Sequence, residues 1–145
     1  FGQYADQWEA LLQEPNRAGN AINEAIRLES PIRGFTRVLS QDHTIGEIKL
    51  FSGERVLILY ASANRDERRW DQPDKFDICR GLTDHVGFGH GIHQCVGMQL
   101  ARLEMRSILT AMIARVSKIE ILGAPVYAKN NVLRGLDSLP IKFIR

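Results

Sequence analysis

Three features are scarce in this sequence: long apolar runs, an excess of one charge, and cysteine. No apolar run reaches the roughly 18 residues that a membrane-spanning helix needs. Nineteen basic and 17 acidic residues leave a net charge of +2, which is too small to indicate a nucleic-acid-binding protein. Cys79 and Cys95 could pair in an oxidising compartment, but nothing else marks the chain as secreted. We therefore expect a cytoplasmic protein that does not bind nucleic acid.

The composition otherwise indicates a single globular core. The 145 residues are 44% apolar, and a chain of this length can bury most of its surface in one core. The chain begins Phe1-Gly2-Gln3, without a starting methionine and without a signal-peptide pattern. This beginning predicts a segment of a longer protein.

Apolar periodicity predicts more helix than strand. Spacings of three and four residues indicate helices, and alternation indicates strands. Pro15 and Pro31 bound the second predicted helix. The expected elements, in order, are a helix at 4–13, a helix from about 18 that ends at Pro31, an extended segment at 32–38, strands within 43–60, an irregular stretch at 61–80, a long helix at 96–116, and strands at 118–122 and 138–143. The expected fold class is mainly α with small β-sheets, an α+β arrangement.

Two of these stretches carry predictions about burial. Alternation between His43 and Tyr60 predicts a β-hairpin with its turn at Ser52-Gly53-Glu54. The second strand of this hairpin, 56–60, is apolar on both faces and should therefore be buried. The helix at 96–116 has an apolar stripe wide enough for a largely buried helix.

The most distinctive stretch is a glycine-rich loop that leads into the long helix. It reads Phe88-Gly89-His90-Gly91-Ile92-His93-Gln94-Cys95-Val96-Gly97. Its glycines permit positive φ and a close approach of the backbone to a flat partner. Cys95 meets the partial positive charge of the helix start, which favours thiolate over thiol. A thiolate at this place is a nucleophile or a metal ligand.

Residue types alone leave two other interpretations of the loop open. His90, His93 and Cys95, with His85 or Cys79, are ligand types of a zinc-stabilised structural module. However, no Cys-x-x-Cys pair is present, and zinc would leave the glycines unexplained. A cysteine hydrolase would pair Cys95 with His93, but no orienting Asn or Asp is indicated.

The loop also carries a family resemblance. Phe88, Gly91, His93, Cys95 and Gly97 fill the pattern Phe-x-x-Gly-x-His-x-Cys-x-Gly, which resembles the haem-ligand loop of the cytochrome P450 family. The resemblance implies heme b as cofactor, with the Cys95 thiolate as axial ligand of the iron, where it favours O–O cleavage. The cofactor-binding residues that it implies are Cys95, His93, Arg37, Phe88, Gly89, Gly97 and Ala101. Among these, His93 and Arg37 would reach the haem propionates.

A second resemblance lies about seventy residues before Cys95. Glu24 and Arg27 are three apart on a predicted helix, where a solvated ion pair is worth about 0.2–0.5 kcal/mol. Glu-x-x-Arg at this distance resembles another signature of the family, which implies a buried pair that is costly to break. The resemblance places Lys75, within Pro73-Asp74-Lys75-Phe76, as the third member of this charged triad. Lysine keeps the charge but lacks the planar fork of arginine.

The resemblance also implies an activity. A haem-thiolate monooxygenase inserts one oxygen atom of O2 into a C–H bond, by hydroxylation or O-demethylation. Ile32, Gly34, Phe35, Val132 and Leu133 would lie on the substrate side, and their apolar character predicts a small hydrophobic substrate. The neighbouring runs look most like bacterial members that act on small aromatic acids and ethers.

Electrons would arrive from a protein partner. The family uses basic residues on the helix that follows the cysteine loop, and the resemblance gives this role to Arg102 and Arg106. The partner implied is a ferredoxin-type electron donor that is reduced by an NAD(P)H-dependent reductase.

The resemblance covers the whole chain but only the C-terminal third or so of a family member. The distal helix that delivers protons to bound oxygen is not in the sequence, and Thr110 lies on the proximal helix. We expect residues 1–145 to be the C-terminal haem-ligand portion of a single P450 domain, with the remainder of the same polypeptide as its partner. This segment alone should neither hold haem tightly nor turn over, and a haem-binding protein without turnover remains an alternative.

Overall fold

The computed structural model describes residues 1–81 and 84–145. These residues form helices and two-stranded antiparallel sheets, so the predicted α+β class is confirmed. The helices are α1 (Ala5–Gln13), α2 (Ala18–Glu29), α3 (Tyr60–Ala63) and α4 (Met98–Ile113), with short 3-10 turns η1 (Pro15–Arg17) and η2 (Gly91–His93). The strands are β1 (Phe35–Val38), β2 (His43–Ile45), β3 (Ile48–Leu50), β4 (Arg55–Ile58), β5 (Lys118–Ile121), β6 (Val126–Tyr127), β7 (Leu136–Ser138) and β8 (Ile141–Ile144).

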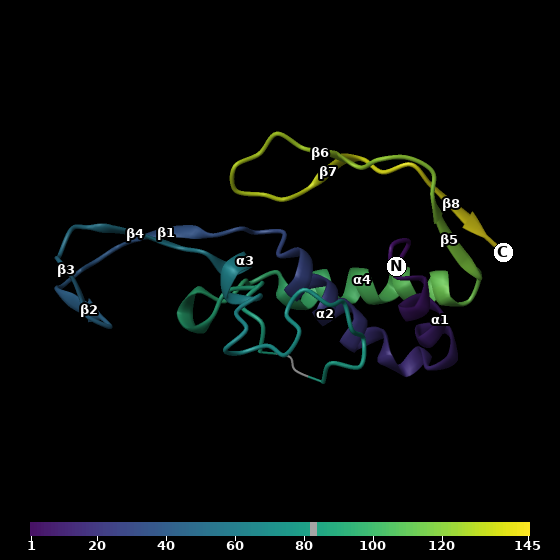
Figure 1. The fold of residues 1–145 in the computed structure, drawn as a ribbon, viewed down its shortest axis with the longest axis horizontal. Coiled ribbons are helices and arrows are strands. Elements are labelled where there is room, and N and C mark those ends of the chain that lie inside the picture. The colour runs from purple at the N-terminus through teal and green to yellow at the C-terminus, as the bar shows by residue number, and fades with distance from the viewer. Residues whose placement is uncertain (82–83) are drawn as a thin grey trace.

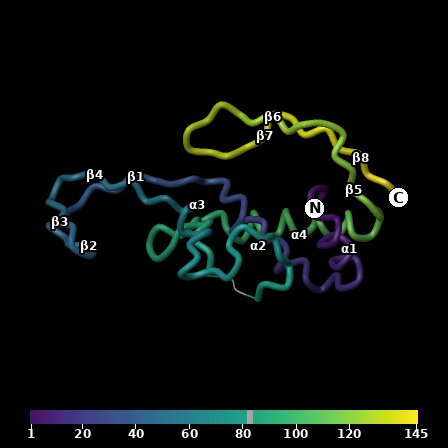
Figure 2. The backbone as a smooth tube through the Cα atoms, viewed as in Figure 1, coloured from purple at the N-terminus to yellow at the C-terminus, as the bar shows by residue number. Residues whose placement is uncertain are grey.

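The helices form the body of the molecule, and the strands extend from it. Figure 1 shows α2 beside α4, with α1 next to them near both chain ends. The segment from β1 to β4 reaches away from the helices as one long excursion of the chain, which Figure 2 traces. Strands β5 to β8 form a second excursion along the other side. None of the described helices is both long enough and apolar enough to cross a bilayer.

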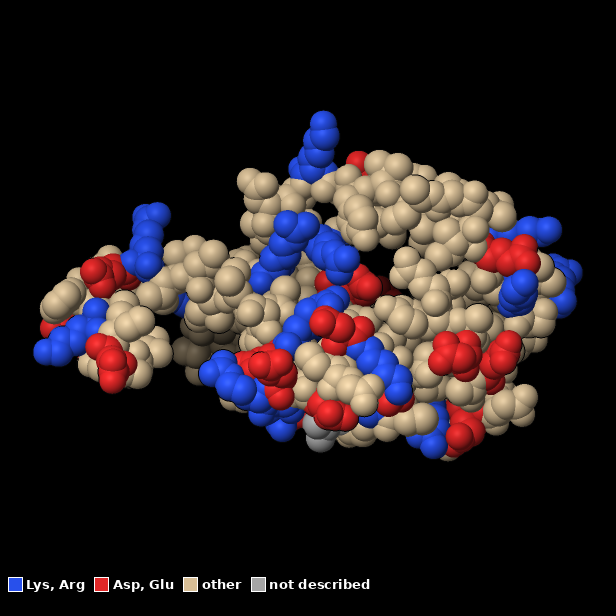
Figure 3. Space-filling model, viewed as in Figure 1, with Lys and Arg blue, Asp and Glu red and all other residues tan. Residues whose placement is uncertain are grey.

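The core lies where α1, α2, the irregular stretch after α3 and α4 meet. Trp8 and Leu11 of α1 pack with Ile22 of α2 because apolar residues three or four apart share one helix face. Phe76 and Ile78 from the irregular stretch are buried in the same cluster. The irregular stretch is therefore part of the core. Figure 3 shows basic and acidic side chains interspersed over the lower part of one face, consistent with the small net charge.

Helix α2 ends where the sequence predicts. Ser30 follows its last residue with φ of 40°, the left-handed conformation that commonly closes a helix. Its amide donates to the carbonyl of Ile26 at 3.0 Å, and its hydroxyl donates to the carbonyl of Arg27 at 2.8 Å. Pro31 then prevents the helix from continuing.

The predicted hairpin within 43–60 was wrong in its pairing and its burial, although the turn at 52–54 is present. The amide of Glu54 donates to the carbonyl of Phe51 at 3.1 Å, which closes this turn. The strands on either side of it do not pair with each other: β2 pairs with β3 around Gly46, whose φ is +60°, and β4 pairs with β1. Leu57 is 62% exposed, since nothing within the described residues covers this ribbon.

The long helix is also less buried than its apolar stripe predicts. Leu109 on the face toward α2 is buried, whereas Ile108, one position away, is 62% exposed. The helix packs on one side only within the described part of the chain. The apolar face of α4 is therefore wider than the part of it that other described residues bury.

A buried ion pair joins α2 to the irregular stretch. Arg27 donates from Nε and Nη2 to the two carboxylate oxygens of Glu24, at 2.7 and 2.8 Å. The same guanidinium donates to the backbone carbonyls of Asn64 at 2.7 Å, Pro73 at 2.7 Å and Lys75 at 3.1 Å. The pair is thus surrounded by acceptors from a segment that is distant in the sequence.

The third charged partner of this pair is Arg80, and this corrects the expected role of Lys75. Arg80 donates from Nε to Glu24 at 3.1 Å and from Nη1 to the carbonyl of Asp71 at 2.7 Å. The side chain of Lys75 is exposed, and its contribution is the backbone carbonyl that accepts from Arg27. The path of the irregular stretch turns Lys75 outward and Arg80 inward.

We predict that Arg80→Gln and Lys75→Gln differ in their effect on stability. Arg80→Gln should lower the free energy of unfolding by about 1.5–3 kcal/mol, the range for a hydrogen bond to a charged group. Lys75→Gln is the matched control, and as a surface change it should stay within about 0.5 kcal/mol of wild type. Urea unfolding of both variants measures the difference. An equal loss in both would mean that Lys75 shares the charged contact.

Candidate functional site

The glycine-rich loop is folded by its own backbone hydrogen bonds. The amide of Cys95 donates to the carbonyl of Phe88 at 2.8 Å, and the amide of Gly89 donates to the carbonyl of Val86 at 2.9 Å. Gly89 has φ of +73°, and a Cβ there would lie 2.8 Å from the carbonyl oxygen of His93. Glycine is therefore required at this position for both conformation and space.

Cys95 lies just before α4, as the sequence predicts. Its carbonyl accepts from the amide of Met98 at 3.2 Å, and its side chain is exposed. The first amides of a helix have no partner within that helix and carry partial positive charge. The thiol is thus presented to solvent beside the start of α4.

The thiol faces a large and mainly apolar cavity of about 780 Å³. The walls come from α2, the segment around β1, the cysteine loop and α4. The lining residues are Ile26, Pro31, Ile32, Phe35, Arg37, Tyr60, Gly87, Phe88, Gly89, His93, Cys95, Val96, Ala101 and Met105. Six of the residues that the resemblance implies for cofactor binding therefore lie around one space: Cys95, His93, Arg37, Phe88, Gly89 and Ala101.

This cavity has the chemistry of a site for a flat apolar group with carboxylates. Cys95 offers a sulfur ligand, while His93 of the cysteine loop and half-buried Arg37 of β1 offer polar donors to the same cavity. Gly97 is outside the lining, and a Cβ there would lie 3.8 Å from the sulfur of Cys95, an ordinary contact. The residues present fit the expected haem in ligand type and in the character of the walls.

The residues of the zinc interpretation do not form a comparable cluster. Within residues 1–81 and 84–145, no three His, Cys, Asp or Glu side chains lie close enough to hold a metal ion together. Cys79 and Cys95 are both free and exposed.

The predicted substrate-side residues are brought together by backbone pairing. Ile32 forms an antiparallel bridge with Leu133, and the amide of Arg33 donates to the carbonyl of Val132 at 3.1 Å. Ile32 and Phe35 line the Cys95 cavity, whereas Val132 and Leu133 are outside its lining.

Glycine is required at position 34 for a structural reason. A Cβ at this position would lie 2.3 Å from the carbonyl oxygen of Ile58. The backbone of the segment before β1 therefore passes too close to β4 for any side chain. Gly34 is outside the cavity lining, and it allows Phe35 to reach the wall.

The two predicted docking arginines have different environments. Arg102 is half-buried, donates from Nη2 to Asn23 at 3.2 Å, and lies over the ring of Phe88 at 5.5 Å. Arg106, one turn further along α4, is exposed. Both line a shallow hollow of about 140 Å³. Arg102 therefore ties α4 to α2 as well as presenting charge, and Arg106 is the more accessible cation.

A supporting residue that sequence reasoning missed is Asn64. It is buried, its Nδ2 donates to the hydroxyl of Ser30 at 3.0 Å, and its Oδ1 accepts from the amide of Val86 at 2.8 Å. One side chain thus joins the end of α2 to the start of the cysteine loop. A single asparagine in an irregular stretch has no pattern that would have predicted this.

His85 lies at the base of the same loop and is buried. Its Nδ1 accepts from the amide of Gly87 at 3.1 Å, which leaves the proton on Nε2. Burial, followed by the nearby cations Arg102 and Arg27, lowers the pKa of His85 to about 4, and Glu24 partly opposes them. His85 is therefore neutral at physiological pH and cannot serve as a cationic ligand site.

Known proteins resemble the chain over nearly all of its length. The family model for cytochrome P450 matches residues 18–119. A protein named cytochrome p450 CYP199A2 from Rhodopseudomonas palustris is 46% identical over 142 residues, which cover 98% of this chain and 34% of that protein. Linalool 8-monooxygenase from Pseudomonas putida is 35% identical over 144 residues, covering 99% of this chain and 36% of that protein. The chain spans about a third of the length of these relatives.

A solved structure agrees with the arrangement of helices and sheets. The crystal structure of P450BioI in complex with hexadec-9Z-enoic acid ligated acyl carrier protein superposes with a TM-score of 0.94 at 35% sequence identity. The match covers 99% of this chain and 37% of that chain.

We predict a pH dependence of stability that comes from His85. Its pKa is near 4 in the folded protein and 6.5 in the unfolded chain, so the unfolded chain takes up the proton first as pH falls. The stability that neutral His85 contributes is complete above pH 6.5 and is lost between 6.5 and 4, with a slope of at most about 1.4 kcal/mol per pH unit. Urea unfolding of wild type and His85→Gln over this range should give a smaller slope for the variant. An NMR titration of His85 with a midpoint at or above 6.5 would contradict the prediction.

Proposed function

Because the chain belongs to the cytochrome P450 family, we propose that the protein is a haem-thiolate monooxygenase. Such an enzyme inserts one oxygen atom of O2 into a C–H bond of its substrate. The observation that carries the proposal is the exposed thiol of Cys95 on the wall of a mainly apolar cavity that also has His93 and Arg37. Residues 1–145 would be the haem-ligand portion of one domain.

The residues of the Cys95 cavity would hold heme b. Cys95 would bind the iron as a thiolate, and bound haem would supply the centre at which O2 is reduced and split. His93 and Arg37 would donate to the propionates, and Arg37 is suited to this by its planar fork. Phe88, Gly89 and Ala101 would form the apolar wall against the ring.

The substrate proposed is a small hydrophobic, aromatic molecule that is hydroxylated or O-demethylated. Ile32 and Phe35 lie on the cavity wall, with Val132 and Leu133 paired behind them. These side chains are apolar, so binding would depend on shape and desolvation. Two relatives are named for different compounds, linalool and a dihydromenaquinone. Because proteins of one family differ in this way, we expect the residues of the cavity wall, and not the fold, to determine specificity.

Residues 1–145 alone would neither hold haem tightly nor turn over. Val96 on the cavity wall and Ile92 of the same loop are 103% and 96% exposed, so this side of the cavity is open to water. Haem bound in these residues alone would keep part of its apolar surface in water, and the binding free energy grows with the apolar area that is buried. The remainder of the polypeptide would have to cover this side.

The electron donor proposed is a ferredoxin-type protein with an NAD(P)H-dependent reductase, in the cytoplasm. Arg106 is exposed on α4, the helix that directly follows the Cys95 loop. A cation there can steer an acidic protein toward the thiolate side of the site. Two free thiols, Cys79 and Cys95, support a reducing compartment.

We predict that Cys95→Ser in the full-length protein abolishes the thiolate-type Soret spectrum and the red-shifted carbon monoxide adduct. Serine offers no thiolate to the iron. Cys79→Ser is the matched control, because Cys79 is also a free exposed cysteine but lies outside the cavity lining. It should keep both spectra. An unchanged spectrum in Cys95→Ser would refute the ligand assignment, and oxygenated product from wild type separates a monooxygenase from a haem protein without turnover.

We predict that Arg106→Glu slows reduction by an acidic ferredoxin on the order of tenfold at low salt, because it reverses a steering charge. Arg115→Glu is the control, since Arg115 is an exposed cation beyond the other end of α4. It should change the rate little. Stopped-flow reduction against salt concentration measures both variants, and substrate binding should be unaffected. Arg102→Glu is less informative because it would also break the contact with Asn23.

A further inference from the structure

The turn at 130–134 is folded onto the segment that follows α2. The side chain of Asn130 accepts from the amides of Val132 and Leu133, both at 2.8 Å, which closes the turn. The amide of Arg134 then donates to the carbonyl of Pro31 at 2.7 Å. Together with the pairing of Arg33 and Val132, this seats the turn against residues 31–33.

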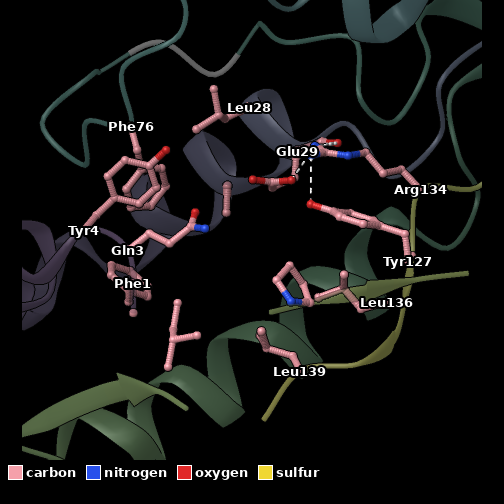
Figure 4. Close-up of a pocket in the computed structure, with 15 residues that line it drawn as sticks. Phe1, Gln3, Tyr4, Leu28, Glu29, Phe76, Tyr127, Arg134, Leu136 and Leu139 are labelled. Carbon is pink, nitrogen blue, oxygen red and sulfur yellow. Dashed lines mark hydrogen bonds and ion pairs between the residues drawn. The ribbon is translucent and has the colours of Figure 1, made fainter. Parts of the chain in front are cut away.

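The side chain of Arg134 fastens this turn to α2 itself. Nη1 donates to the Glu29 carboxylate at 2.5 Å and to the Glu29 carbonyl at 3.4 Å, while Nη2 donates to the hydroxyl of Tyr127 at 3.4 Å. The guanidinium also lies 5.5 Å from the centre of the Tyr127 ring. Figure 4 shows Arg134 extending from the strand segment toward Glu29, with Tyr127 beside it. A cation is favourable at this place because Glu29 is the last residue of α2.

The turn adjoins the Cys95 cavity through its backbone partners. Pro31 and Ile32, against which the turn is seated, are wall residues of that cavity. The Arg134 and Glu29 side chains are 31% and 55% exposed, so their pairing contributes little to global stability. The effect of this ion pair is local: it influences the position of the 130–134 turn relative to Pro31 and Ile32.

We infer that Arg134 is a positioning residue, which through Glu29 and Tyr127 holds the 130–134 turn against Pro31 and Ile32 and thereby sets the shape of the substrate side. The effect on the substrate side rests on the proposed function. The contact itself can be measured independently. Arg134 does not bind the substrate in this arrangement, since its guanidinium is already engaged by Glu29.

The first test is amide hydrogen exchange in the full-length protein. The amides of Arg33 and residue 134 report on the seating of the turn, because both donate across it. Arg134→Met and Glu29→Gln should speed their exchange by up to about fivefold, as expected for a partly exposed ion pair worth about 1 kcal/mol or less, with a smaller effect for Arg134→Lys. The amide of Ser30, which caps α2, should not change. Lys129→Met is the matched control, since Lys129 is exposed and its side chain makes no hydrogen bond with residues 1–81 or 84–145.

The second test is substrate binding, followed by the low-to-high-spin shift of the haem-loaded protein. Arg134→Met should weaken binding of 4-methoxybenzoate and of neutral 4-methoxytoluene alike, by about tenfold, while the carbon monoxide adduct stays that of wild type. A loss confined to the benzoate would overturn the inference, because it would mean that Arg134 binds the carboxylate directly.

Failure of the inference and failure of the proposed function give different results. Unchanged exchange at Arg33 and residue 134 in Arg134→Met refutes the positioning role, whatever the enzyme does. No spin shift in wild type with either probe counts against the proposed substrate, and the exchange result then decides the positioning role on its own. Faster exchange throughout α2 would indicate general unfolding and would also overturn the local role.

Discussion

The charge of Arg27 is the constraint on which the rest of the structure depends. Its side chain is 1% exposed, and a buried cation without partners would cost several kcal/mol. Glu24 supplies one set of acceptors, and the backbone carbonyls of Asn64, Pro73 and Lys75 supply the others. The irregular stretch must therefore return to α2 with its carbonyls turned toward one guanidinium. Its path is determined by electrostatics, although it has little regular secondary structure.

The position of the cysteine loop follows from that path. Once the irregular stretch lies on α2, buried Asn64 can bond both Ser30, which caps the helix, and Val86, which begins the loop. Gly87 then lies so close to Ile26 that a Cβ would be 2.6 Å from its side chain. The thiol is thus held in place relative to α2 by hydrogen bonds and by close packing. This rigidity is what a ligand to a fixed group requires.

Local spacing predicted what depends on local geometry. Helices α1, α2 and α4, the end of α2 and the positive φ of Gly89 follow from short-range patterns. Pairing between distant segments was less predictable: turns form at both Gly46 and Gly53, but alternation did not show that β4 pairs with β1 and not with β3. Arg80, and not Lys75, reaches Glu24 because the path of the chain decides which cation points inward. The docking of segments therefore had to come from the structure.

Helix α2 carries two glutamate–arginine pairs whose burial gives them different roles. Glu24 and Arg27 are nearly inaccessible, so breaking this pair leaves an unpaired buried charge and threatens the fold. Glu29 and Arg134 are partly in water, where an ion pair is worth about 1 kcal/mol or less. The buried pair therefore cannot vary without loss of structure, whereas the exposed pair can. Under the proposed function, substitutions at the end of α2 that faces the 130–134 turn would shift a wall of the cavity, while the contacts that hold the cysteine loop on α2 would stay in place.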